Sequence, residues 1–216
     1  MISNQALGIF GGTFDPLHMG HINPILEAAS QLSINKIALI PCHIPSHKGA
    51  ASTSSEHRLA MVKLLCQQYP IFFPDEREIK RNKPTYSIDT LRELRRLHPQ
   101  TPLCFFIGMD SLHSLPTWRH WQELCELCHF VVCQRGGQTA QFSPQISQLL
   151  KERQVTMPDE IQQTRAGKIF IADTKPVAIS STALRERLAK QLPVDGLIPA
   201  PVVKYIKQHK LYTQNT

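Results

Sequence analysis

The segment Gly11–His21 constrains the fold and the chemistry of this chain more than any other. It follows a short apolar run at 6–10, predicted to form a strand, and precedes residues 22–32, predicted to form a helix. Glycines between a strand and a helix let the backbone approach a ligand closely, and the free amides at a helix N-terminus attract phosphate. His18 and His21 are three residues apart and can both face that phosphate from the first helical turn. The segment therefore predicts a site that stabilises charge on the phosphorus of a nucleotide.

Short apolar runs alternate with helical patterns along the whole chain. Strands are predicted at residues 6–10, 36–40, 103–107, 130–133 and 169–171, with a weaker candidate at 71–73. Helices are predicted at residues 22–32, 56–69, 87–97, 118–127, 180–192 and 202–209. Such alternation indicates an α/β fold: a Rossmann-like, doubly wound parallel sheet with helices on both faces. Ligands bind beyond the carboxyl ends of the strands in such sheets, where the glycine segment is expected.

The length of 216 residues favours a single domain, 1–216. Residues 135–167 are polar and weakly periodic, which predicts a surface insertion. This insertion either contains a short helix near 145–151 or is a plain solvated loop, and the loop is favoured. Residues 180–216 are expected to form a C-terminal helical part, whose hydroxyl-rich start suits N-capping.

The formal net charge of +7 suits anionic partners such as nucleotides, nucleic acid or an acidic membrane surface, or else marks a merely basic surface. Lysines and arginines are scattered, apart from groups at 80–83 and 92–96, so a nucleic-acid interface is not expected. No apolar run is long enough to span a membrane, and the first residues do not resemble a signal peptide. A cytoplasmic location with six reduced cysteines is therefore expected.

One cysteine segment has two conflicting interpretations. Residues 125–129 match the Cys-x-x-Cys-His pattern of haem attachment, and zinc could recruit Cys125, Cys128, His129 and Cys133. The surrounding residues are apolar, and buried free cysteine is common in protein cores. We therefore expect no resident metal here.

Other nucleotide-binding signatures are absent from the sequence. It contains neither the P-loop pattern nor the dinucleotide pattern Gly-x-Gly-x-x-Gly, which argues against kinases, ATPases and dehydrogenases. Gly-Gly-Thr-Phe-Asp-Pro at 11–16, followed by His-x-Gly-His at 18–21, instead resembles the signature of the nucleotidyltransferase superfamily. Ile-Ser-Ser-Thr-Ala-Leu-Arg at 179–185 resembles its second motif. Residues 41–48, 83–91 and 106–118 resemble the bacterial nicotinate-nucleotide adenylyltransferase branch, although Ser46 stands where the branch has a second proline.

This resemblance implies adenylyl transfer from ATP to nicotinate mononucleotide, giving deamido-NAD, a precursor of NAD, and pyrophosphate, with Mg²⁺. A related transferase for another phosphorylated acceptor, such as phosphopantetheine, is the alternative. The expected partners are thus small nucleotides, with no nucleic acid and no membrane, and the oligomeric state is left open.

The resemblance also implies a role for individual residues. The catalytic residues would be His18, His21 and Arg185. The ATP-binding residues would be Gly11, Gly12, Thr13, Phe14, Gly108, Asp110, Ile179, Ser180 and Ser181. Nicotinate mononucleotide would contact Lys48, Thr85 and Trp118, with Trp118 stacking on the pyridine ring and Thr85 facing the carboxylate.

Overall fold

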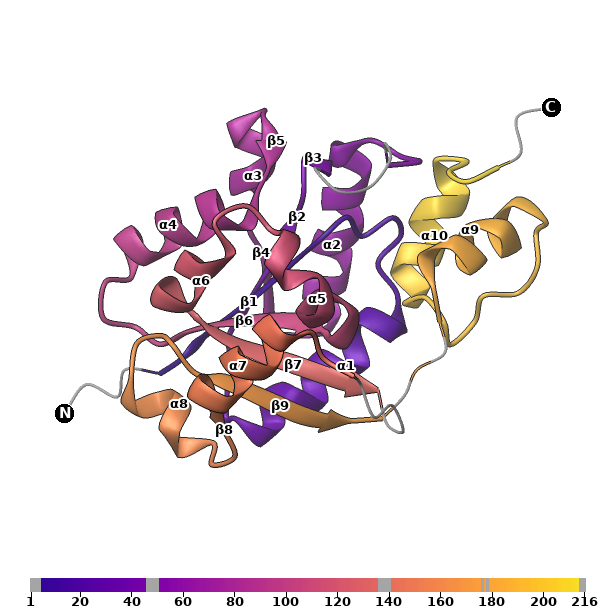
Figure 1. The fold of residues 1–216 in the computed structure, drawn as a ribbon. Coiled ribbons are helices and arrows are strands. Elements are labelled where there is room, and N and C mark those ends of the chain that lie inside the picture. The colour runs from indigo at the N-terminus through magenta and orange to yellow at the C-terminus, as the bar shows by residue number, and fades with distance from the viewer. Residues whose placement is uncertain (1–4, 46–50, 136–140, 176, 178, 214–216) are drawn as a thin grey trace. The chain divides into compact units, whose positions relative to one another are not determined.

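A computed structural model describes residues 5–45, 51–135, 141–175, 177 and 179–213. Its main feature is a seven-stranded parallel sheet with the order β4-β2-β1-β6-β7-β9-β8 (Figure 1). The strands of this sheet are β1 (Leu7–Gly12), β2 (Ile37–Pro41), β4 (Phe72–Pro74), β6 (Leu103–Gly108), β7 (His129–Arg135), β8 (Gln154–Val155) and β9 (Ile169–Thr174). Strands β2 and β4 lie on one side of β1, and β6 pairs with β1 on its other side. The predicted doubly wound α/β class is therefore confirmed.

Helices fill most of the connections between the strands. They are α1 (Met19–Gln31), α2 (Ser55–Gln68), α3 (Arg77–Arg81), α4 (Ser87–Leu97), α5 (Met109–Ser114), α6 (Trp121–Leu127), α7 (Pro144–Arg153), α8 (Asp159–Gln163), α9 (Ser181–Ala189) and α10 (Ala200–Gln208). A 3₁₀ turn, η1 (Leu115–Thr117), follows α5, and a small two-stranded sheet joins β3 (Ile44–Pro45) to β5 (Pro84–Thr85). Two predicted helix starts are three residues off: α1 begins earlier, at Met19, and α6 later, at Trp121.

The chain forms two compact units, and the first comprises residues 1–10, 24–38 and 86–176. Its sheet is built from near-continuous apolar runs, as expected for parallel strands covered on both faces. Phe105 of β6 lies in register with Phe130 of β7, and Val131 with Phe170 of β9. Figure 1 shows β6, β7 and β9 side by side. This pairing fixes the carboxyl end of β6, from which the segment beginning at Met109 continues.

The favoured plain loop at 135–167 is wrong for the residues of this segment that the structure describes. The alternative, a short helix, is present as α7, which buries Ile146 and Leu149. Val155 in β8 then pairs with Phe170 in β9, so this segment supplies an edge strand of the sheet. Its apolar residues were too sparse to show the helical period in a polar background, but burial of a few large side chains suffices to hold short elements.

The second unit comprises residues 11–23, 39–85 and 177–216. Its core joins α2, α9 and α10 through six buried residues: Met61, Leu184, Val194, Ile198, Val202 and Ile206. Figure 1 shows α9 and α10, in gold and yellow, side by side. Ser54 caps α2 and Ser180 caps α9, each accepting a backbone N–H from three residues on. The predicted hydroxyl cap at the start of α9 is therefore confirmed.

Candidate active site

The bend between β1 and α1, residues 13–18, is compact because Gly12 before it and Gly20 after it leave room for side chains of the bend. A Cβ on Gly12 would lie 2.8 Å from the Phe14 ring, and one on Gly20 would lie 2.9 Å from Nδ1 of His18. Phe14 itself is buried and has a left-handed backbone, with φ of 53°. An aromatic residue rarely adopts this conformation, so the surrounding structure must hold it there.

The bend brings His18 and His21 together. Their rings stack with centroids 3.7 Å apart and planes 28° apart. His18 is 2% exposed, whereas His21 is partly exposed, and the Phe14 ring meets His21 edge-on at 5.7 Å. Two imidazoles thus lie at the start of α1. The expected free amides are engaged there: the Met19 amide donates to the Leu197 carbonyl, and the His21 and Ile22 amides donate to the His18 carbonyl. The helix dipole favours a negatively charged group at this position.

The start of α9 lies against the same bend within the second unit. Arg185 donates from Nη1 to the carbonyl of Asp15 at 2.8 Å, and from Nη2 to Oγ1 of Thr182 at 3.1 Å. Ser181 donates from Oγ to the Pro16 carbonyl at 3.3 Å. The Cβ of Ile179 would lie 3.2 Å from a Cβ on Gly20. Both motifs singled out in the sequence therefore meet in space, although about 165 residues separate them.

Arg58 of α2 was missed by the sequence analysis. It is 1% exposed and binds backbone carbonyls that surround the bend. Its Nη1 donates to the carbonyls of Thr13 and Cys42 at 2.8 and 2.6 Å, and its Nη2 to that of His43 at 3.0 Å. A planar guanidinium can join several carbonyls at fixed angles, so Arg58 ties together the segments that follow β1 and β2. An arginine at the start of an amphipathic helix gives no sequence signal of such burial.

Thr85 lies in the small sheet of the second unit, next to His43. Its Oγ1 accepts the His43 amide at 3.3 Å, and Ile44 and Pro84 pair in the adjacent register. The His43 ring is held in turn by Ser55 and Asn82. The predicted Lys48 lies outside the described residues.

Gly108, Asp110 and Trp118 belong to the first unit: Gly108 ends β6, and the other two residues follow it. Gly108 precedes α5, and a Cβ there would lie 2.5 Å from Oδ1 of Asp110, so only glycine lets this carboxylate fold back. Asp110 is exposed at the first turn of α5. Trp118 ends the 3₁₀ turn, is half-buried and meets Phe105 edge-on at 6.3 Å. Its partial exposure leaves indole surface for a ligand.

The cysteine segment of the first unit is packed into the core. Cys125, Cys128 and Cys133 are buried, and burial raises the pKa of each thiol. Both ring nitrogens of His129 are engaged: Nε2 donates to the Thr164 carbonyl at 2.8 Å, and Nδ1 accepts the Lys168 amide at 3.1 Å. Within the described ranges, no group of three or more His, Cys, Asp or Glu could hold a metal ion.

His129 gives a stability prediction with a defined sign. Burial lowers its pKa to about 4, against an ordinary value of about 6.5. As the pH falls from 6.5 towards 4, the unfolded chain therefore gains a proton that the folded chain does not. We expect the free energy of unfolding to fall by about 3 kcal/mol over this interval from His129 alone. Urea titrations across this pH range, compared with His129→Gln, should show a shallower decline in the variant; parallel curves would contradict the assignment.

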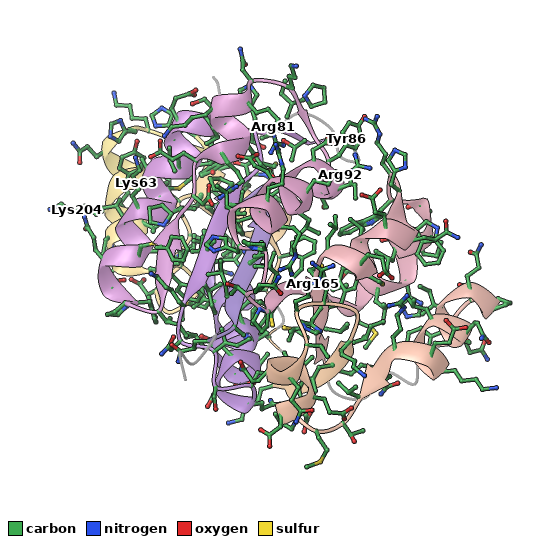
Figure 2. All side chains as sticks on the ribbon, turned by 90° about the vertical axis from the view of Figure 1, so that its left-hand side faces the viewer. Lys63, Arg81, Tyr86, Arg92, Arg165 and Lys204 are labelled. Atoms are coloured by element: carbon green, nitrogen blue, oxygen red, sulfur yellow. The ribbon has the colours of Figure 1, made fainter. Side chains whose placement is uncertain are left out.

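The two basic groups of the sequence are largely engaged in internal contacts. Arg92, at the surface of α4 in Figure 2, makes a two-fold contact with Glu123 at 2.6 and 2.7 Å. Arg95 is buried, and Lys80 lies 3.4 Å from Glu76. Arg92, Arg95 and Lys80 of these groups thus each have a carboxylate or carbonyl partner.

Comparison with known proteins agrees with this fold. Residues 9–187 match the cytidylyltransferase-like family, and the chain belongs to it. A Pseudoalteromonas atlantica protein named "probable nicotinate-nucleotide adenylyltransferase" is 51% identical over 98% of this chain and 96% of its own length. An Aeromonas salmonicida protein of the same name is 47% identical over 95% of this chain and 96% of its own length. Within the wider family, the chain thus belongs to the nicotinate-nucleotide adenylyltransferases.

Solved structures show the same fold at low sequence identity. The Plasmodium falciparum nicotinic acid mononucleotide adenylyltransferase complexed with NaAD superposes with a TM-score of 0.69 at 20% identity. The match covers 96% of this chain and 97% of that one.

Proposed function

We propose that this protein transfers the adenylyl group of ATP to nicotinate mononucleotide, releasing pyrophosphate and forming deamido-NAD for NAD biosynthesis. The observation that carries the proposal is the stacked pair His18 and His21, with Arg185 tethered to the same bend. Family membership gives the acceptor: the curated relatives at 51% and 47% identity carry the name of this activity.

The chemistry needs positioning and charge stabilisation rather than a protein nucleophile. The phosphate of the mononucleotide attacks the α-phosphorus of ATP in line, and pyrophosphate leaves from the opposite side. Negative charge develops on the α-phosphoryl oxygens and the leaving group, where His18 and His21 can donate hydrogen bonds. The guanidinium of Arg185 suits the β- and γ-phosphates, since its planar fork binds two oxygens together. Gly11, Gly12, Thr13 and Phe14 shape the bend, and Ile179, Ser180 and Ser181 bring the start of α9 to it.

Magnesium enters this proposal as part of the substrate. No cluster of three His, Cys, Asp or Glu that could hold a metal occurs in the described parts of the chain. We therefore infer that Mg²⁺ arrives on the triphosphate, where it neutralises charge on the phosphate oxygens. This chain's own residues orient the loaded triphosphate.

The remaining assignments concern the ribose and the acceptor. Gly108 and Asp110 would bind the ATP ribose, because an exposed carboxylate beside a strand end can accept its hydroxyls. Thr85 and the backbone amides near it would face the nicotinate carboxylate, and Lys48 would meet a phosphate as a point charge. Hydrogen bonds to a carboxylate are worth about 1.5–3 kcal/mol, which predicts preference for nicotinate over nicotinamide by roughly tenfold to a hundredfold.

We also propose that the reaction takes place in the cytoplasm, where ATP is abundant. None of the helices in the described ranges is long and apolar enough to cross a membrane.

Trp118 offers a specific prediction about the acceptor. We expect Trp118→Ala to raise KM for nicotinate mononucleotide about tenfold and KM for ATP much less, because only the pyridine ring would lose its stacking partner. Steady-state kinetics with each substrate varied in turn checks this. Trp121→Ala is the matched control, since Trp121 is also partly exposed and lies three residues away. Equal effects on the two KM values would contradict the stacking role.

The reaction itself is tested by pyrophosphate release from ATP and Mg²⁺ with three acceptors. We expect rapid release with nicotinate mononucleotide, slow release with nicotinamide mononucleotide and none above background with phosphopantetheine. Rapid release with phosphopantetheine alone would assign a different transferase.

A further inference from the structure

Asp15 in the bend is a buried carboxylate held by segments distant in sequence. It is 4% exposed. The Tyr212 hydroxyl donates to its Oδ1 at 2.7 Å, and the Ser52 amide donates to its Oδ2 at 2.6 Å. Its main-chain carbonyl accepts the hydrogen bond from Arg185. A buried carboxylate is stable only when its oxygens are hydrogen-bonded, so these partners fix where Asp15 lies.

Tyr212 is well suited to hold one of these oxygens permanently. Burial raises the pKa of its phenol, and the neighbouring Asp15 carboxylate raises it further, so the hydroxyl stays protonated and donates. Its backbone is left-handed, with φ of 58°, in the turn that follows α10. An aromatic residue adopts this conformation only where the surrounding contacts enforce it. The turn after α10 therefore places the Tyr212 hydroxyl within hydrogen-bond distance of Asp15.

We propose that Tyr212 is a positioning residue for the reaction, acting through Asp15 on the histidine pair and on Arg185. Asp15 is three residues before His18, and its carbonyl anchors the guanidinium of Arg185. A shift of this one residue therefore displaces the imidazoles and the arginine together. The proposal rests on the function proposed above and adds a residue near the C-terminal end of the described chain to its machinery.

The test compares two tyrosines that each lose only a hydroxyl. The Tyr205 hydroxyl in α10 bonds Nδ1 of His57 at 2.9 Å, so Tyr205→Phe is the matched control for Tyr212→Phe. We expect comparable, modest losses of thermal stability in both variants. Only Tyr212→Phe should lower kcat, by about tenfold, with KM for both substrates changed by less than about twofold.

A double-mutant cycle identifies the route of the effect. If Tyr212 acts through Asp15, then Tyr212→Phe should lower kcat no further in an Asp15→Asn background. Fully multiplicative effects, or equal loss of kcat in the two tyrosine variants, would overturn the proposal.

Histidine ring resonances in NMR provide a readout that needs no substrate. Those of His18 and His21, assigned with His18→Gln and His21→Gln, should move in Tyr212→Phe and stay in place in Tyr205→Phe. If the wild-type protein released no pyrophosphate, the proposed function would fail, and these resonances alone would decide the positioning role. Unmoved resonances in Tyr212→Phe would overturn it in either case.

Discussion

Replacing His21 by alanine is expected to lower kcat by about 100- to 1,000-fold, the usual cost of removing one positioned donor from a developing oxyanion. His21 is partly exposed and stacked on His18 at 3.7 Å, so its loss removes a donor without opening the core. If the imidazole acts mainly in the transition state, kcat and kcat/KM should fall together. Pyrophosphate release under saturating ATP and nicotinate mononucleotide measures the effect.

The matched control for this prediction is His209→Ala, which removes an exposed imidazole at the end of α10 in the same unit. Its kcat should stay within about twofold of wild type, as is usual for surface positions outside a site. A His21→Ala enzyme with near-normal kcat would remove this imidazole from the mechanism.

Arg58→Lys is expected to have the largest effect on stability, with a loss of about 3 kcal/mol or more in the free energy of unfolding. Lysine cannot reproduce the fork that joins the carbonyls of Thr13, Cys42 and His43, so buried oxygens lose their donors. Because Thr13 begins the bend, we also expect kcat to fall at least about tenfold. Urea unfolding gives the first quantity, and turnover of the folded fraction gives the second.

Arg95 provides the comparison, because the first unit contains a buried arginine of the same kind. Its guanidinium donates to the carbonyls of Leu127, His98, Thr101 and Arg165, and burial lowers its pKa. Arg95→Lys should cost similar stability yet leave kcat of the folded enzyme within about twofold. Equal losses of kcat in both variants would show that Arg58 acts on the fold in general rather than on the bend.

The sequence predicted the long elements well because their periodicity is strong. In α4, for example, Ile88, Leu91 and Leu94 form one buried stripe, as their spacing indicates. Short elements such as β8 and α5 were missed, since two to six residues carry no measurable period. Their existence depends on neighbours: Val155 is a strand residue because Phe170 lies beside it.

The site was predictable to the extent that its residues are close in sequence. His18 and His21 share a helical turn, and Ser180 begins a helix, so spacing alone indicated both arrangements. Arg58 and Tyr212 were missed because each contacts the bend from a distant part of the chain. A basic residue on a helix and a tyrosine near the chain's end look like ordinary surface residues until tertiary packing buries them.

The left-handed backbone of Phe14 sets a limit on how this enzyme could be made more robust. Asparagine or glycine would adopt φ of 53° at lower conformational cost. Phe14 is 2% exposed, however, so either exchange would leave a cavity; loss of a buried phenylalanine costs about 3–5 kcal/mol, more than the roughly 1–3 kcal/mol of backbone strain that it relieves. The same exchange would remove the aromatic ring beside His21. Selection for durability therefore retains this strained residue, because its ring fills the core around the bend.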